Sequence, residues 1–238
     1  MQRATALALI GVVTFGLWAL AQTPQQPKVQ PGPNEPNWVD ILEHRYALKI
    51  FDDLLNPVKT TPAATPGLFK KAGPGPVVFT PVIALGLEVP IHGGWYTPGD
   101  DAQNPKTHEL WSYQYKHTAK DIKEAETLTI IPLITPSNTT FDPGDQPFGL
   151  WIGNDQFKDR VYSQPQVVAA TNPRLAKQPY KAMIYPNKDR DTDKIIPHSY
   201  IIGWEYSTND DFQDVVTRID NVELITDGEK AKSEKSRD

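Results

Sequence analysis

Residues 182–224, AMIYPNKDRDTDKIIPHSYIIGWEYSTNDDFQDVVTRIDNVEL, decide the fold expected for this chain. Two apolar runs within them, residues 201–204 and 215–219, are separated by a short acidic segment. Short runs of aliphatic and aromatic residues bounded by turn residues are typical of β-strands. The sequence therefore predicts a strand, an acidic turn and a second strand.

Similar runs recur at short intervals before and through this stretch, separated by Pro, Gly, Asn and Asp. They are residues 77–85, 110–117, 127–134, 148–152, 161–162, 180–185, 200–206 and 215–224. Many short strands with turn residues between them predict an all-β fold, and eight strands fit a two-sheet, jelly-roll-like β-sandwich. We expect this domain to span residues 58–225, followed by a disordered charged tail over residues 226–238.

The first 21 residues have the pattern of a secretory signal peptide. Arg3 precedes an apolar run that ends in Ala19-Leu20-Ala21. A positive start, an apolar middle and a small-x-small end predict cleavage after Ala21 and a secreted or surface-attached protein with no membrane span after cleavage. The alternative is an uncleaved anchor, because the run is close to the minimum length that spans a bilayer.

Residues 22–36 form a proline-rich segment that predicts an extended spacer. Residues 37–57 predict a helix that packs on the domain, with Asn37 as its cap and Asn56-Pro57 at its end. Residues 46–51 also fit a strand, and that alternative stays open.

Composition narrows the classes of function. The chain has 238 residues, a formal net charge of −5 and no cysteine. An acidic chain without a basic stripe argues against nucleic acid as a partner. The absence of cysteine rules out disulfides, so bound metal ions could supply part of the stability of a secreted domain.

Three carboxylates at the C-terminal strand pair are the candidate metal ligands. Glu205 ends the first strand, and Asp211 and Asp214 precede the second. If they converge, their mutual repulsion requires a cation such as Ca²⁺ or a basic partner, for which Arg218 is available. The alternative is a solvated turn in which one Asp caps local backbone groups.

A second acidic segment, residues 189–193, includes Asp189 and Asp191. It lacks the glycine and the final glutamate of a helix-loop-helix calcium loop. These two acids could donate oxygens to an ion shared with Glu205. They could instead form a charged hairpin tip in which Arg190 and Lys194 offset the acids.

The same strand pair resembles a domain of unknown function that often ends secreted bacterial surface proteins and calcium-dependent adhesins. The resemblance rests on residues 201–205, IIGWE, and on residues 211–216, DFQDVV. Gln213 stands where the family usually has Asn, and Tyr206 stands where a second acid is common. The resemblance implies a β-sandwich in which the three acids named above are calcium-site positions.

Aromatic residues form a second candidate site. Trp111 and Tyr113 share one face of a predicted strand, and Trp95 and Tyr96 lie in a predicted glycine-bracketed loop over residues 93–101. Flat aromatic rings beside polar groups can hold the pyranose rings of carbohydrates. The alternative is that an aromatic stripe of period two is the core face of a strand.

The chain shows few signs of an enzyme. Its five histidines lack metal-ligand spacing, and no nucleophile motif is present. The sequence therefore predicts a calcium-stabilised, non-enzymatic module that binds carbohydrate or another extracellular polymer. The alternatives are a structural or assembly protein, including a homo-oligomer, and a glycoside hydrolase that uses two of the acids.

Overall fold

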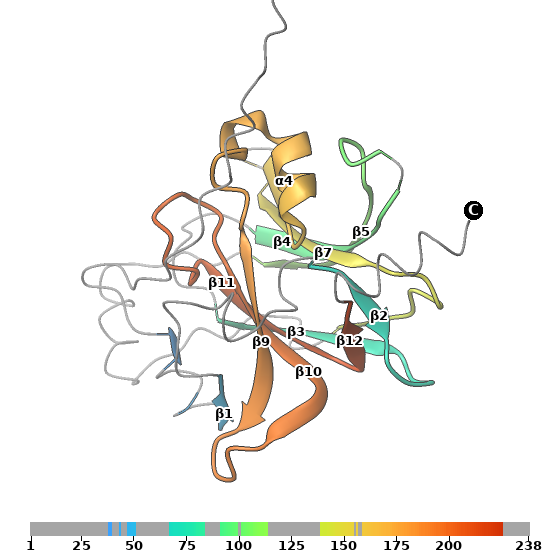
Figure 1. The fold of residues 1–238 in the computed structure, drawn as a ribbon, viewed down its shortest axis with the longest axis vertical. Coiled ribbons are helices and arrows are strands. Elements are labelled where there is room, and N and C mark those ends of the chain that lie inside the picture. The colour runs from blue at the N-terminus through green and yellow to red at the C-terminus, as the bar shows by residue number, and fades with distance from the viewer. Residues whose placement is uncertain are drawn as a thin grey trace, which may run out of the picture.

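The computed structural model describes residues 38–39, 43, 47–50, 67–83, 91–99, 101–113, 139–154, 156 and 159–225. These residues form antiparallel sheets and the short α-helix α4, Pro165–Thr171, which lies over β4 and β7 (Figure 1). The one-turn 3₁₀-helix η2, Pro173–Leu175, follows it. The prediction of a mostly β fold is confirmed.

The strands form three sheets. The six-stranded sheet has the order β1 (Leu48–Lys49), β9 (Ala182–Asp189), β10 (Ile195–Trp204), β11 (Val215–Asp220), β3 (Val77–Ile83) and β6 (Thr139–Phe141). The four-stranded sheet has the order β5 (Lys106–Tyr113), β4 (Ile91–Thr97), β7 (Gly149–Asn154) and β8 (Asp159–Tyr162). The third sheet pairs β12 (Val222–Leu224) with β2 (Phe69–Lys71).

The largest cluster of buried apolar side chains joins the two main sheets. Ile184 and Ile202 enter it from the six-stranded sheet, and Leu150 and Ile152 enter it from the four-stranded sheet. Side chains alternate between the two faces of a strand, so every second residue of these strands can reach this cluster. Burying each aliphatic side chain contributes about 1.5–3 kcal/mol, which makes this cluster the main source of stability.

The opposite face of the six-stranded sheet is also covered. Trp38 and Ile50 pack there against Tyr185, Ile201 and Phe212. The rings of Trp38 and Tyr185 lie 6.0 Å apart. Residues 201–204 of β10 are buried on both faces, which explains why this part of the strand is a continuous apolar run and not an alternating one.

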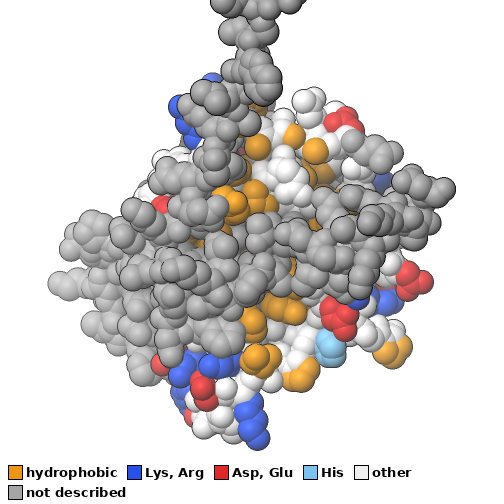
Figure 2. Space-filling view, in the orientation of Figure 1, with side chains coloured by type: hydrophobic (Ala, Val, Ile, Leu, Met, Phe, Trp, Pro, Cys, Tyr) orange, Lys and Arg blue, Asp and Glu red, His pale blue; other side chains and the backbone are white. Residues whose placement is uncertain are grey.

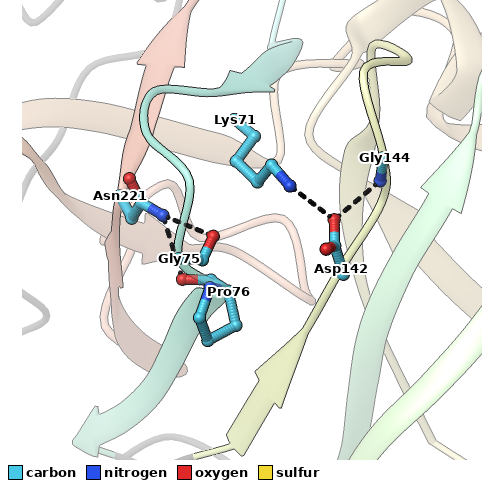
Figure 3. Close-up of polar contacts among 6 residues, drawn as sticks. All are labelled: Lys71, Gly75, Pro76, Asp142, Gly144 and Asn221. Carbon is cyan, nitrogen blue, oxygen red and sulfur yellow. Dashed lines mark hydrogen bonds and ion pairs between the residues drawn. The ribbon is translucent and has the colours of Figure 1, made fainter.

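Asn221 fixes the bend between β11 and β12 (Figure 3). Its φ of 64° lies in the left-handed region, which Asn tolerates better than most residues. Its amide nitrogen donates to the carbonyls of Gly75 and Pro76 at 2.8 and 3.1 Å. These bonds hold the connection between β2 and β3 against the end of β11.

Asp142 ties a second turn to the same region (Figure 3). Its carboxylate accepts from the Lys71 ammonium and from the backbone N–H of Gly144, each at 2.9 Å. These two bonds hold the pKa of Asp142 below its ordinary value, with the Lys71 bond as the larger cause. The turn after β6 is thereby attached to β2.

The hairpin of β9 and β10 ends in charged residues. Figure 2 shows basic and acidic side chains together at the end of the molecule where this hairpin lies in Figure 1. Asp193 pairs there with Lys188 at 2.8 Å and with Lys49 of β1 at 3.2 Å. Exposed pairs of this kind stabilise proteins only weakly.

The predicted helix over residues 37–57 is wrong at residues 48–49, and residues 51–57 lie outside the described residues. Trp38, Val39 and Glu43 are helical, but Leu48 and Lys49 form β1 and pair with Asp189 and Lys188 of β9. Leucine and lysine are good helix formers, but intrinsic propensity is a weak determinant, and hydrogen bonding to a neighbouring strand outweighs it. The strand alternative is confirmed at those positions.

One predicted loop contains a strand, and the sequence analysis missed the strand β2 and the helix α4. Residues 93–101 include most of β4, whose backbone is fixed by pairing with both β5 and β7. The segment before residue 77 includes β2. Helix α4 has the sequence PQVVAAT, which is too short to show a helical period.

Several predictions concern residues that are not described. The signal peptide, the proline-rich spacer, the charged tail and the run at residues 127–134 all lie outside the described residues. Within the part of the chain that the structure covers, no helix combines the length and apolar character needed to cross a membrane.

Candidate functional site

The three acids predicted at the C-terminal strand pair lie in one loop, residues 205–214. Trp204 pairs with Val215, so the end of β10 and the start of β11 are adjacent. Glu205 directly follows Trp204, and Asp214 directly precedes Val215. The register of this pairing thus places both residues at the same end of β10 and β11. Glu205, Asp211 and Asp214 are at most 4% exposed, whereas residues 207–209 at the tip of the loop are exposed, so the solvated-turn alternative fits only the tip.

Backbone N–H groups donate hydrogen bonds to the buried carboxylates of this loop. The carboxylate of Glu205 accepts from the Asp211 N–H at 3.0 Å and from the Ser207 hydroxyl at 2.6 Å. One oxygen of Asp214 accepts from the N–H groups of Tyr206 at 2.6 Å and Ser207 at 3.2 Å. Carboxylates that accept several backbone bonds tolerate burial, because these bonds replace water.

Side-chain oxygens alternate along the loop at residues 205, 207, 209 and 211. The hydroxyl oxygen of Ser207, which donates its proton to Glu205, also lies against the amide oxygen of Asn209, and the amide nitrogen of Asn209 donates to the Asp211 carboxylate. Asp211 also accepts from the Gln213 N–H at 3.3 Å. Four oxygen-bearing side chains are therefore connected within seven residues.

Lys181 is the basic partner of these acids. Its side chain is buried, and its ammonium donates to the Ser207 carbonyl at 2.5 Å. Burial lowers the pKa of Lys181 below the ordinary lysine value, while the charges of Glu205, Asp210 and Asp214 act in the opposite direction. A fixed internal cation thus faces the carboxylates.

The predicted partner, Arg218, is directed elsewhere. It lies within β11, opposite Ile201 and Thr80 in the neighbouring strands, and its guanidinium bonds the Asp220 carboxylate at 2.8 Å. The sequence analysis did not single out Lys181. Its position directly before β9 is next to the loop only because β9 pairs with β10, a long-range contact that local sequence does not show.

The backbone of the loop is held in an unusual conformation. Asp210 and Phe212 have positive φ values of 71° and 58°. The Phe212 ring is fully buried in the cluster on the outer face of the six-stranded sheet. A Cβ on Gly203 would lie 2.7 Å from the Phe212 carbonyl oxygen, so glycine at this position of β10 permits the close approach.

The side-chain oxygens of this loop are of the chemical types that bind calcium. Carboxylate, hydroxyl and amide oxygens are the hard ligands that Ca²⁺ prefers. The backbone N–H groups compete with an ion for the carboxylate oxygens, and the Lys181 ammonium, which bonds the Ser207 carbonyl, adds a positive charge nearby. Among the described residues, no group of three or more His, Cys, Asp or Glu side chains has the arrangement of a metal site.

Asp189 and Asp191 do not join the other acids. Asp189 lies at the far end of β9 from Ala182, which pairs with Trp204. Seven residues of strand separate the two ends by about 23 Å. Asp189 accepts from the Thr192 N–H at 2.8 Å, and Asp191 pairs with Arg190 at 3.0 Å. The alternative of a charged hairpin tip describes these residues.

The aromatic residues predicted as ligand contacts lie in strands. Trp111 is buried in the core, and Tyr96 is fully buried with its hydroxyl donating to the Gln164 amide oxygen at 2.7 Å. Burial raises the pKa of Tyr96 well above its ordinary value. Trp95 is half-buried and stacks on His108 with ring centroids 4.1 Å apart.

These aromatic rings therefore make protein contacts, as the core-face alternative anticipated for Trp111. Tyr113 ends β5 and pairs with Ile91, and its side chain lies outside the described residues. Pairing of β4 on both sides explains why Trp95 and Tyr96 are not in an open loop.

A polar cavity beside the four-stranded sheet was not predicted. It has a volume of about 390 Å³, and its lining includes His92, Asn154, Asp159, Arg160, Tyr162 and Asn172. These residues come from β4, β7, β8 and the end of α4, so only the tertiary fold brings them together. The sequence feature that could have indicated this cavity is the charged pair Asp159-Arg160, next to the apolar residues of a short predicted strand.

Comparison with known proteins does not assign this chain to a family. The sequence matches no protein-family profile and no curated protein.

Proposed function

We propose that this protein is a secreted or surface-attached binding module, stabilised by calcium, whose ligand is a carbohydrate or another extracellular polymer. The observation that carries the proposal is the loop 205–214, where the buried carboxylates of Glu205 and Asp211 lie next to the exposed oxygen-bearing side chains of Ser207 and Asn209. Buried carboxylates at such a position favour a structural role over catalysis, because they are inaccessible to a large substrate.

The architecture supports a β-sandwich of the binding-module type. The six-stranded and four-stranded sheets contribute to one hydrophobic cluster, which is the expected result of two sheets packed face to face. Sandwiches of this kind present loops and one sheet surface to ligands while the core stays rigid. We further propose that this sandwich is of the jelly-roll class and that it is related to the C-terminal domain of calcium-dependent adhesins that the strand pair resembles.

In the calcium-bound form, Glu205 and Asp211 would hold the ion together with the side-chain oxygens of Ser207 and Asn209. The ion would supply positive charge that relieves carboxylate repulsion, as Lys181 does in part. Asp214 would keep the hydrogen bonds that it accepts from two backbone N–H groups at the start of the loop.

Thermal unfolding in calcium and in EDTA tests this proposal. An ion that binds only the folded state stabilises it by about 2.7 kcal/mol at a hundred times its dissociation constant, so calcium should raise the melting temperature. Magnesium should do so less, because it demands a stricter octahedral geometry.

The Asp211→Asn variant should lose the calcium effect. Asp191→Asn serves as the matched control, because Asp191 lies at the exposed hairpin tip and should leave the effect unchanged. Equal melting temperatures in calcium and EDTA for the wild-type chain would refute the calcium part of the proposal.

A structural or assembly role is the second candidate. Among the described strands, β5 spans eight residues and forms one edge of the four-stranded sheet. A long edge strand can pair with another copy of the chain. Size-exclusion chromatography with light scattering would show oligomers in that case and a monomer if the module acts alone.

Glycoside hydrolysis has less support. A hydrolase needs two carboxylates on either side of the glycosidic bond. The described lining of the polar cavity offers one, Asp159, and the predicted acids are buried elsewhere. We therefore propose a protein without enzymatic activity.

A further inference from the structure

The polar cavity beside the four-stranded sheet has the features of a ligand site. Its volume of about 390 Å³ falls within the range of small-molecule sites, roughly 300–1,000 Å³. It lies where the ends of β7 and β8 meet the end of α4, and its described lining is mainly polar. Asp159 and Arg160 of this lining are exposed, while Asn154 is buried, so the cavity combines accessible charged groups with a buried amide.

One buried ring holds two of the lining side chains in place. Trp151 is 1% exposed, and its indole N–H points toward the carbonyls of Trp95 and His108 at 3.2 and 3.3 Å. The guanidinium of Arg160 lies 4.6 Å above this ring, and the His92 ring meets its edge at 5.1 Å. Both polar groups therefore keep one orientation without a ligand.

Further contacts fix the charged groups of the cavity. Nδ1 of His92 lies 3.0 Å from the Glu109 carboxylate, which directs the other ring nitrogen away from Glu109. Arg160 donates to the Thr107 hydroxyl at 3.3 Å. Preorganised groups of this kind lower the entropy cost of binding.

Gly153 lets His92 and Arg160 lie close to the backbone of β7. A Cβ at this position would lie 3.1 Å from Nε2 of His92, 3.0 Å from the Cγ of Arg160 and 3.1 Å from the Asp159 carbonyl oxygen. A side chain here would therefore shift the imidazole and the arginine stem. The glycine permits their present positions at the cavity.

The chemistry of the lining favours a neutral, hydroxyl-rich ligand. Arg160 supplies donors, Asp159 supplies acceptors, and the amides of Asn154 and Asn172 supply both. Sugar hydroxyls donate and accept in the same way, so adjacent hydroxyls can match an arginine and a carboxylate together. A phosphate or another polyanion would meet the charges of Asp159 and of Glu109 behind His92.

We infer that this cavity is the carbohydrate-binding site of the protein and that it takes a neutral sugar unit. The cavity replaces Trp95 and Tyr96, the ligand contacts predicted from sequence. The inference rests on the proposed function, because it supplies the location and ligand class of that binding activity. Arg160 and Asp159 determine the specificity of the site by bonding neighbouring hydroxyls.

Isothermal titration of the full chain tests the site with five probes: the methyl glycosides of glucose, galactose and mannose, glucuronate, and inorganic phosphate. We expect at least one neutral glycoside to bind, and we expect Arg160→Ala and Asp159→Asn each to weaken it about tenfold or more, as for loss of a charged hydrogen bond. Arg174→Ala is the matched control, because Arg174 is exposed on η2 outside the cavity lining. Circular dichroism of each variant confirms that it folds.

The outcomes separate this inference from the proposed function. Glycoside binding that is unchanged in both cavity variants overturns the inference and leaves the proposed carbohydrate-binding function intact. Binding of glucuronate or phosphate without any neutral glycoside overturns the ligand class assigned to the cavity. No binding of any probe overturns both the inferred site and the proposed carbohydrate ligand, whereas the calcium measurement stands on its own.

Discussion

At the scale of single residues, buried charge defines the loop 205–214. Lys181 and three carboxylates are enclosed together, and backbone N–H groups complete the set of hydrogen bonds. Such a group is stable only when every member keeps its partner, since an unsatisfied buried polar group costs about 1–3 kcal/mol. Single substitutions in this loop should therefore have large effects on stability.

Asp214 offers the most direct test of that expectation. Asp214→Ala leaves the N–H groups of Tyr206 and Ser207 without this acceptor and should lower the free energy of unfolding by about 3 kcal/mol. Asp214→Asn keeps an amide oxygen as an acceptor and should cost less. Urea denaturation measures both, and equal stability of Asp214→Ala and the wild-type chain would contradict the assigned contacts.

Lys181 should make stability depend on pH in the alkaline range. Its pKa in the folded state is lowered, mainly by burial, from the ordinary value of 10.5. Between the lowered pKa and 10.5 the unfolded chain binds more protons than the folded chain, so the free energy of unfolding rises with pH across that window. The raised pKa of buried Tyr96 acts in the opposite direction above its ordinary value of 10.0.

Denaturation with urea from about pH 8 to pH 10 measures this contribution. Lys181→Met should remove the rise, while Lys177→Met, an exposed control on the turn after η2, should retain it. A Lys181→Met variant that shows the same pH dependence as the wild-type chain would assign the rise to other groups.

At the scale of elements, the close approach of β10 and the loop 205–214 depends on a glycine. Gly203 lies in a strand buried on both faces, and the carbonyl of Phe212 occupies the space where a side chain would stand. A side chain can enter only if the loop moves, and the loop is held by the buried Phe212 ring.

Gly203→Ala should therefore destabilise the protein by about 1–3 kcal/mol, the usual cost of overpacking. Gly99→Ala is the matched control, because the nearest atom to its added Cβ lies 3.9 Å away. We expect the control to change stability by less than about 0.5 kcal/mol. Differential scanning calorimetry compares the two variants. A larger loss of stability for Gly99→Ala than for Gly203→Ala would contradict the close contact assigned to Gly203.

At the scale of the whole molecule, the two main sheets share one hydrophobic cluster. Trp204 of β10 belongs to it, and Trp151 of β7 lies on the other face of the four-stranded sheet in a separate small cluster with α4. Neither sheet can keep its apolar face buried if the other separates. The described domain should therefore unfold as one cooperative unit.

Tryptophan fluorescence can follow the two sheets separately. Trp204→Phe removes the tryptophan in the strands of the six-stranded sheet, and the triple variant Trp95→Phe, Trp111→Phe, Trp151→Phe removes those of the four-stranded sheet. The unfolding curves of each variant should coincide with those from far-ultraviolet circular dichroism. Different midpoints for the two probes within one variant would show that the sheets unfold independently.

Parts of the fold and of the candidate site could be predicted from sequence. The runs at residues 77–85 and 200–206 correspond to β3 and β10, because long apolar runs carry a strong local signal. The shared loop of Glu205, Asp211 and Asp214 was also predictable, since a strand, a short turn and a strand bring the turn residues together whatever surrounds them.

Local sequence by itself determined a mostly β chain, the strands on either side of residue 210 and the acids between them. The tertiary structure alone decided that Lys181 and not Arg218 faces those acids, that Tyr96 is buried, and that Arg160 borders a cavity. The physical reason is that strand pairing joins residues far apart in the chain, and the register of that pairing determines which side chains meet.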